Sequence, residues 1–236
     1  MSNKNEKFII VLSVFLIFLS GLNTIVNYEL LSTMKGEEGI KNLFSNNNVK
    51  LKDISENYLG NLNSDIVVLI FSDFECPYCG ASEGTHKGLI DGFKAQDPTW
   101  EAAIPKLREL AKDNKIKLVF KQYPLDFHQY AQKSAEASLC ASEQGKFWEY
   151  HDVLFENQNA LSTAKLSEYA ESLGLNVLRF DECLDSGIMR EKVSADINEG
   201  NSLGVRGTPA FVINGQLLSG AQSFSAINQV INAMRG

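Results

Sequence analysis

Two cysteines three positions apart, Cys76 and Cys79, are the residues of this sequence best suited to chemistry. They lie in the stretch FSDFECPYCG at residues 71–80, with Pro77 and Tyr78 between them. Four chemistries use this spacing: disulfide exchange, zinc binding, haem attachment and a structural disulfide. Pro77 suits the first turn of a helix, because the N–H group that proline lacks would have no partner there. The stretch therefore predicts a cysteine at the start of a helix.

This placement favours disulfide exchange. Unpaired N–H groups and the helix dipole stabilise an anion at a helix N-terminus, and the thiolate is the nucleophilic form of cysteine. Cys79 lies one turn further along, within reach of the Cys76 sulfur. It can therefore resolve a mixed disulfide formed at Cys76.

The three other chemistries fit less well. Haem attachment requires a histidine directly after the second cysteine, where this sequence has Gly80. A tetrahedral zinc site usually takes a second pair of closely spaced ligands, whereas Cys140 and Cys183 stand alone. A structural Cys76–Cys79 bridge would close a small loop and gain little entropy. We expect neither a metal nor a cofactor, and zinc and a structural bridge remain the alternatives.

The segments around the motif have the pattern of an α/β fold. Residues 64–71, SDIVVLIF, form a β-branched apolar run typical of a buried strand. From Cys79 to Pro98 the chain is polar and interrupted by glycine. The elements predicted after it are a helix at 100–114, a strand at 115–125, a helical block at 128–203, a hairpin of AFVI and QLLS about Asn214-Gly215, and a helix at 223–234. This order is a βαβ unit and a ββα unit with helices inserted between them.

A second feature favours redox chemistry. The stretch GVRGTPAF at residues 204–211 places Thr208-Pro209 directly before a strand. A proline that stands two residues after a glycine and leads into a strand is a candidate cis-proline. An ordinary trans proline at a strand entry is the alternative.

Three segments, in this order, resemble the DsbA family of thioredoxin-fold proteins. They are LGNLNSDIVVLIFSDFECPYC, FKQYPLDFH with AQKSAEASLCASEQGKFWEYHDVLFEN, and GVRGTPAFVINGQLLSGAQ. The resemblance implies a thioredoxin domain in two parts, at 59–127 and 204–236, with a helical domain at 128–203 inserted between them. It also implies activity in the bacterial periplasm.

The resemblance assigns roles to individual residues. Cys76 matches the nucleophile, Cys79 the resolving thiol and Pro209 the cis-proline beside them, and Thr208 would contact the substrate backbone. The archetypal oxidase of the family has Pro-His between its cysteines, whereas this chain has Pro77-Tyr78. A histidine there helps to hold the thiolate, so we expect Tyr78 to leave Cys76 less strongly activated.

Two departures favour rearrangement over donation of disulfides. The archetypal oxidase has valine before its cis-proline, while isomerases of the DsbC type have threonine, as at Thr208. Pro-Tyr combined with Thr-Pro resembles the ScsC group, in which an N-terminal extension can form trimers.

The N-terminus predicts export. Lys4 and Lys7 precede an apolar run at residues 8–22, the layout of a secretory signal. Residues 1–22 are therefore expected to be a signal peptide or an uncleaved membrane anchor. Residues 23–58 are expected to form an extension or linker, either an oligomerising segment or a membrane-proximal tether. Its candidate packing positions are Leu30, Leu31, Met34, Ile40, Leu43 and Phe44.

Export also bears on the other two cysteines. Thiols outside the cytoplasm meet oxidants, so we expect Cys140 and Cys183 to form a structural disulfide within the helical block. Buried free thiols are the alternative. His128 is expected to be a polar group at a helix start and His151 a packing residue of the helical domain, neither of them catalytic.

These features predict an exported thiol–disulfide oxidoreductase that acts on cysteines of secreted proteins, with a preference for isomerisation. The alternatives are a dithiol oxidase and a redox-inert chaperone with a thioredoxin-like fold. We expect a membrane-linked redox partner and a homo-oligomer formed through the N-terminal segment. The net charge of −7 and the lack of a dense basic patch argue against nucleic-acid binding.

Overall fold

The computed structural model describes residues 57–235. The predicted signal or anchor at 1–22 lies outside them, as do the packing positions proposed for the N-terminal extension. Among the described residues, no helix has both the length and the apolar character needed to cross a membrane.

Within residues 57–235 the strands form one mixed sheet. Its spatial order is β1-β3-β2-β4-β5, and only β2 and β3 run parallel. The bounds are β1 Tyr58–Gly60, β2 Val67–Ser72, β3 Lys117–Gln122, β4 Ala210–Ile213 and β5 Gln216–Ser219. Tyr58, which we expect in the N-terminal extension, instead pairs with Val119 of β3.

The helices fall into three groups along the chain. Between β2 and β3 lie α4 (Pro77–Glu83), α5 (Lys87–Gln96) and α6 (Ala103–Lys112). Between β3 and β4 lie α7 (Ala131–Ser142), α8 (Phe147–Glu156), α9 (Thr163–Ser172), α10 (Val177–Ser186) and α11 (Arg190–Ser202). The last helix is α12, Phe224–Ala233.

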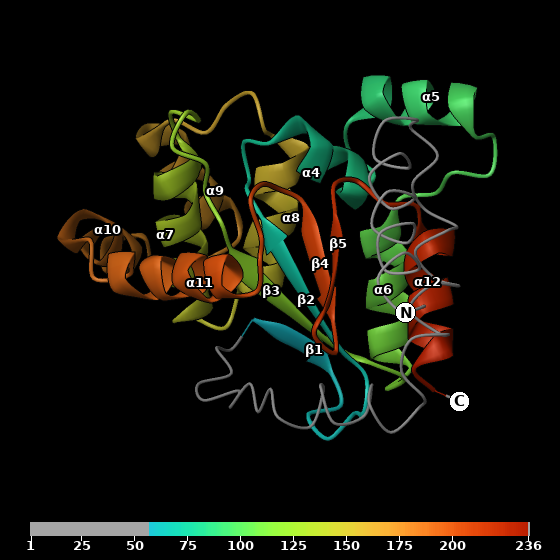
Figure 1. Ribbon diagram of the computed structural model, residues 1–236. Coiled ribbons are helices and arrows are strands. Elements are labelled where there is room, and N and C mark those ends of the chain that lie inside the picture. The colour runs from blue at the N-terminus through green and yellow to red at the C-terminus, as the bar shows by residue number, and fades with distance from the viewer. Residues whose placement is uncertain (1–56, 236) are drawn as a thin grey trace, which may run out of the picture. The chain divides into compact units, whose positions relative to one another are not determined.

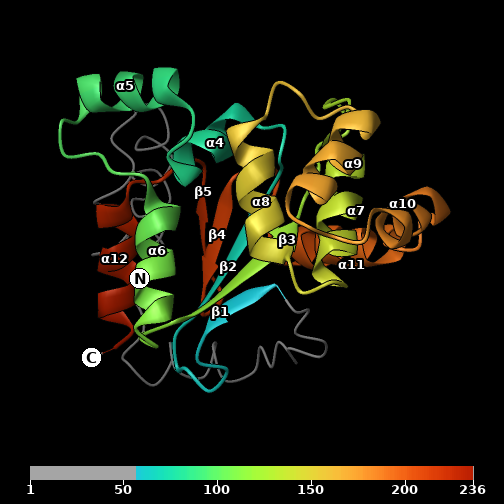
Figure 2. The same ribbon diagram turned by 180° about the vertical axis from the view of Figure 1, so that it is seen from behind.

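The two faces of the sheet are covered by different helices (Figures 1 and 2). Side chains of a strand alternate between the faces. Val68 and Ile70 accordingly pack in one cluster with Leu107 of α6 and residues of α12. Leu69 and Phe71 pack on the opposite face, together with residues around α11. Strand β2, which leads into the cysteine motif, is thus buried on both sides.

The core formed by α7 to α11 is continuous with the cysteine motif, because Phe74, Cys76 and Cys79 pack in the same cluster. Cys140 and Cys183 are joined by a disulfide within it. Tyr150 and Phe180 pack there ring against ring, and α8 lies over Phe120 of β3. The predicted α/β thioredoxin fold with an inserted helical domain is therefore confirmed.

One helix differs from expectation. The sequence from Cys79 to Pro98 shows only a polar stretch interrupted by glycine. Helix α4 ends at Glu83, where Gly84 takes a left-handed conformation with φ of 87°. The separate helix α5 follows, and none of its residues is buried. Its glycines at 88 and 92 lower helix propensity, so its only sequence signal was the spacing of Leu89, Ile90 and Phe93.

Candidate active site

The site lies where β2 leads into α4. Cys76 occupies the N-cap position of α4 in an extended conformation, and Pro77 begins the helix. Cys76 is 4% exposed, and Cys79, one turn later, is fully buried. Both cysteines are free thiols in this structure. The strand fixes the first sulfur at the helix N-terminus, and the helical turn brings the second sulfur to it.

The surroundings of Cys76 favour its thiolate. A hydrogen bond from the Cys79 thiol lowers the pKa of Cys76 to about 6, against the opposing effect of burial. The Thr208 side chain and the backbone N–H groups of Cys79 and Tyr78 contribute in the same direction. The first turn of α4 thus supplies donors to the sulfur, as expected for an anion at a helix N-terminus.

Cys79 behaves in the opposite way. Burial raises the pKa of its thiol well above the ordinary value, and the neighbouring Cys76 sulfur raises it further. The Ser72 hydroxyl, at the end of β2, opposes this rise through a hydrogen bond. One sulfur of the pair is therefore prepared to attack as a thiolate, while the other keeps its proton.

The loop before β4 lies against this pair. The Thr208–Pro209 peptide bond is cis, and the Cys76 thiol donates to the Thr208 carbonyl across 3.5 Å. The Thr208 hydroxyl is buried beside the Cys76 sulfur, and no other described residue offers it a hydrogen bond. The structure therefore brings together the two segments that the sequence analysis linked only by resemblance.

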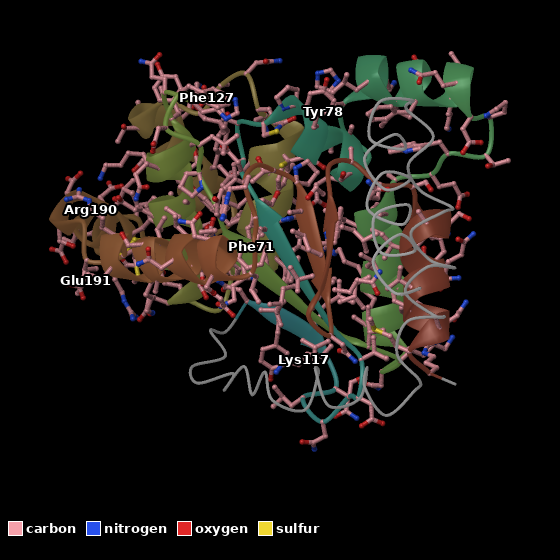
Figure 3. All side chains as sticks on the ribbon, viewed as in Figure 1. Phe71, Tyr78, Lys117, Phe127, Arg190 and Glu191 are labelled. Carbon is pink, nitrogen blue, oxygen red and sulfur yellow. A yellow bond between two sulfur atoms is a disulfide. The ribbon has the colours of Figure 1, made fainter. Side chains whose placement is uncertain are left out.

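Aromatic side chains lie at the same end of the domain. Figure 3 shows Tyr78 and Phe127 there, with Lys117 at the opposite end. Tyr78 is 49% exposed and Phe127, from the loop between β3 and α7, is 79% exposed. The Tyr78 ring packs at 6.4 Å from Phe93 of α5. Tyr78, which replaces the histidine of a Pro-His motif, thus packs against α5, a helix that the sequence did not predict.

A buried carboxylate beside the motif was not singled out from the sequence. Asp73 directly follows β2, and its carboxylate accepts hydrogen bonds from the backbone N–H groups of Glu75 and Leu125. His128 Nδ1 lies 2.7 Å from it. Burial raises the pKa of Asp73, and these hydrogen bonds oppose the rise. Asp73 therefore fastens the loop after β3 to the cysteine motif, and His128 is more than a helix-start group.

Gln158 is a second residue that the sequence analysis missed. It follows α8 and donates two hydrogen bonds to backbone carbonyls of the cysteine motif. Together with Glu75, Pro77 and Tyr130 it lines a cavity of about 470 Å³. No pattern in the sequence marks this glutamine, because its partners are backbone atoms far away along the chain.

His151 is fully buried, and it also carries ion pairs. Its Nε2 lies 3.0 Å from Glu83 at the end of α4, and its Nδ1 lies 2.8 Å from Asp152. Arg108 of α6 pairs with the same aspartate. Burial lowers the pKa of His151, but the two carboxylates outweigh it and raise the pKa. The predicted packing residue therefore also links α4 and α8 through hydrogen bonds to carboxylates, and Arg108 of α6 joins them at Asp152.

The arrangement can perform one kind of chemistry directly. A thiol with a lowered pKa lies in contact with a second thiol and beside the loop of the cis Thr208–Pro209 peptide. This arrangement suits capture and release of a sulfur in another chain. Cys140 and Cys183 are bonded to each other within the helical block, and neither forms a disulfide with this pair. Within residues 57–235, no group of three or more His, Cys, Asp or Glu residues is placed to hold a metal ion.

Among solved structures, three illustrate the likeness in fold. The thiol–disulfide exchange protein α-DsbA2 of Wolbachia pipientis has a TM-score of 0.64 at 19% identity, covering 84% of this chain and 96% of that one. BdbD of Bacillus subtilis has a TM-score of 0.64 at 20% identity, covering 78% and 96%. The catalytic domain of Proteus mirabilis ScsC has a TM-score of 0.61 at 19% identity, covering 82% and 97%.

Curated relatives match over a similar stretch of this chain. The Na⁺/H⁺ antiporter NhaA 3 of Salinispora tropica is 34% identical over 174 residues, which is 73% of this chain and 24% of that protein. NhaA 1 of Salinispora arenicola is likewise 34% identical, over 176 residues, 74% of this chain and 24% of that protein. The chain thus spans about a quarter of the length of these relatives.

A family model also matches. It describes a DSBA-like thioredoxin domain and covers residues 91–232, which begin after the cysteine motif. The motif is therefore an observation independent of that match. Since the match takes in more than half of the chain, the protein belongs to the family of DSBA-like thioredoxin domains.

Proposed function

We propose that this protein exchanges disulfides in exported, cysteine-containing proteins through Cys76 and Cys79. One observation carries the proposal: two adjacent buried free thiols lie at a helix N-terminus beside the cis Thr208–Pro209 peptide, and their pKa values are shifted in opposite directions. Structural cysteines have no need of this asymmetry, whereas a nucleophile and its resolving partner do.

The exchange balances without a cofactor. The Cys76 thiolate attacks a substrate disulfide, forms a mixed disulfide and releases one substrate sulfur as a thiolate, which takes up a proton. Cys79 then loses its proton and attacks the Cys76 sulfur. The Cys76–Cys79 bond forms, the bond to the substrate breaks, and the substrate leaves reduced. The reverse sequence donates the disulfide to a dithiol.

We infer that rearrangement is the preferred direction. Two residues support this inference. Thr208 before the cis-proline matches isomerases of the DsbC type, and Tyr78 combined with Thr208 matches the ScsC group. An isomerase would need a membrane-linked partner that keeps Cys76 reduced. The second candidate is a dithiol oxidase, which the lowered Cys76 pKa favours, because stabilising the thiolate stabilises the reduced form and makes the disulfide more oxidising.

Two assays on the full chain test the function and its direction. Refolding of scrambled ribonuclease measures rearrangement, and oxidation of a dithiol peptide measures donation. We expect Cys76→Ala to abolish both activities and Cys140→Ser with Cys183→Ser to retain them. Oxidation without rearrangement would favour the second candidate. Activity that persists in Cys76→Ala would contradict the proposal and favour a redox-inert chaperone.

The export of the protein is part of the proposal. It rests on the charged and apolar N-terminal pattern of residues 1–22, and fractionation of the cells that make the protein would test it. The antiporter activity of the curated relatives is not carried over, because the matched stretch is 24% of their length.

A further inference from the structure

Gln158 reaches from the helical block into the cysteine motif. It lies in the loop between α8 and α9, and its Nε2 donates to the carbonyl of Phe74 across 2.8 Å and to the carbonyl of Cys76 across 3.0 Å. These two carbonyls lie on either side of Glu75, in the segment between β2 and α4. A single amide group therefore fastens both ends of the turn that presents Cys76.

The amide lies directly on the first turn of α4. The Cys76 carbonyl also accepts the helical hydrogen bond from the N–H of Gly80, across 3.1 Å. A Cβ atom added to Gly80 would lie 2.0 Å from Oε1 of Gln158. An alanine at this position would therefore push the end of the glutamine side chain away.

The loop that carries Gln158 is itself anchored on both sides. The Asn157 side chain donates to the carbonyl of Val153 in α8 across 2.8 Å. The Tyr169 hydroxyl of α9 donates to the carbonyl of Ala160 across 2.9 Å. The position of the amide therefore follows the position of the helical block.

We propose that Gln158 is a positioning residue for disulfide exchange, through which the helical block holds the first turn of α4 and thereby the Cys76 sulfur. The inference rests on the proposed function. The donors that stabilise the thiolate include the N–H groups of Tyr78 and Cys79 in this same turn. Their direction toward the sulfur depends on how the turn is held, and Gln158 holds it from outside the helix.

The first test replaces Gln158 by methionine, which keeps the length of the side chain and removes both donors. The ultraviolet absorbance of the thiolate in the reduced protein is followed against pH. We expect the Cys76 midpoint to rise by at least about 0.5 pH units, a threefold change in the ionisation constant. The matched control is Asn159→Ala, an exposed neighbour in the same loop, which should leave the midpoint unchanged. An unchanged midpoint in a folded Gln158→Met protein overturns the proposal.

The second test uses Gly80. In the wild-type background, Gly80→Ala pushes the amide away and should raise the midpoint as Gln158→Met does. In a Gln158→Ala background the same change should add nothing, because neither the clash nor the hydrogen bonds remain. Equal effects of Gly80→Ala in both backgrounds would contradict the role of Gln158.

The titration separates this inference from the proposed function. If the wild-type protein exchanges disulfides and Gln158→Met has the same Cys76 midpoint as the wild type, only the inference about Gln158 is refuted. A wild-type protein without exchange activity defeats the proposed function, and the thiolate midpoint still decides whether Gln158 positions Cys76.

Discussion

The Thr208 hydroxyl is expected to set how strongly Cys76 ionises. It is buried beside the Cys76 sulfur, it lacks another partner among the described residues, and it contributes to lowering the Cys76 pKa to about 6. Thr208→Val removes the hydroxyl and keeps the shape of the side chain. A hydrogen bond to a charged acceptor contributes about 1.5 kcal/mol, which corresponds to about one pKa unit. The variant should therefore titrate at about 7.

This shift has two measurable consequences at neutral pH. The thiolate fraction of Cys76 at about pH 7 should fall from about nine-tenths to about one half. The lost hydrogen bond stabilises only the thiolate, so the reduced form is destabilised by about 1 kcal/mol while the disulfide form is unchanged. The reduction potential of the Cys76–Cys79 pair therefore falls by about 20 mV. Thiolate absorbance measures the first quantity, and equilibration with glutathione measures the second.

A matched variant completes the experiment. Thr208→Ser keeps the hydroxyl and loses only a methyl group, so its midpoint should stay near that of the wild type. A Thr208→Val midpoint that is unchanged or lower would refute the reasoning, because the hydroxyl would then not stabilise the thiolate. Equal shifts in both variants would assign the effect to packing of the loop.

Three further predictions concern stability. Replacing Cys140 and Cys183 by serine opens a loop with a sequence separation of 43. In the chain-entropy model this should lower the free energy of unfolding, measured in urea, by about 4 kcal/mol. A loss below about 1 kcal/mol would contradict the model. His151→Leu leaves the buried Glu83 carboxylate without its imidazole partner, whereas Asp152 keeps Arg108, and should cost about 3 kcal/mol. Because the folded pKa of His151 is raised, its contribution is complete below its unfolded value of about 6.5 and is lost as pH rises through the folded pKa. The gap between wild type and variant should therefore narrow in alkaline urea titrations, and a gap that widens would count against the ion pairs. In the reduced protein the Cys76 pKa is lowered from 9.0 to about 6, so its contribution is complete above the unfolded value and is lost as pH falls through the folded one. The unfolding free energy of reduced wild type, relative to Cys76→Ser, should rise by about 1.4 kcal/mol per pH unit between these values, and a flat difference would exclude a stabilised thiolate.

The elements of the fold could largely be predicted from the sequence. Buried strands have continuous apolar runs, as at residues 64–71, and the AFVI and QLLS strands about Asn214-Gly215 form β4 and β5 with those bounds. Helix α5 was missed because its two glycines and its lack of buried residues weaken both signals on which such predictions rely. Strand β1 was missed because three residues carry too little pattern to mark a strand.

The candidate site likewise has a part that the sequence could predict and a part that it could not. The spacing of Cys76 and Cys79 and the proline between them depend on local chemistry, so the sequence alone was enough to predict a thiolate at a helix start. The contacts from distant segments could not be predicted from the sequence alone. The buried Thr208 hydroxyl, the Asp73 carboxylate and the Gln158 amide act through atoms that only the folded chain brings near the sulfur. Hydrogen bonds to backbone carbonyls and N–H groups leave no mark on residue types, and for that reason the tertiary structure decided how the two cysteines differ.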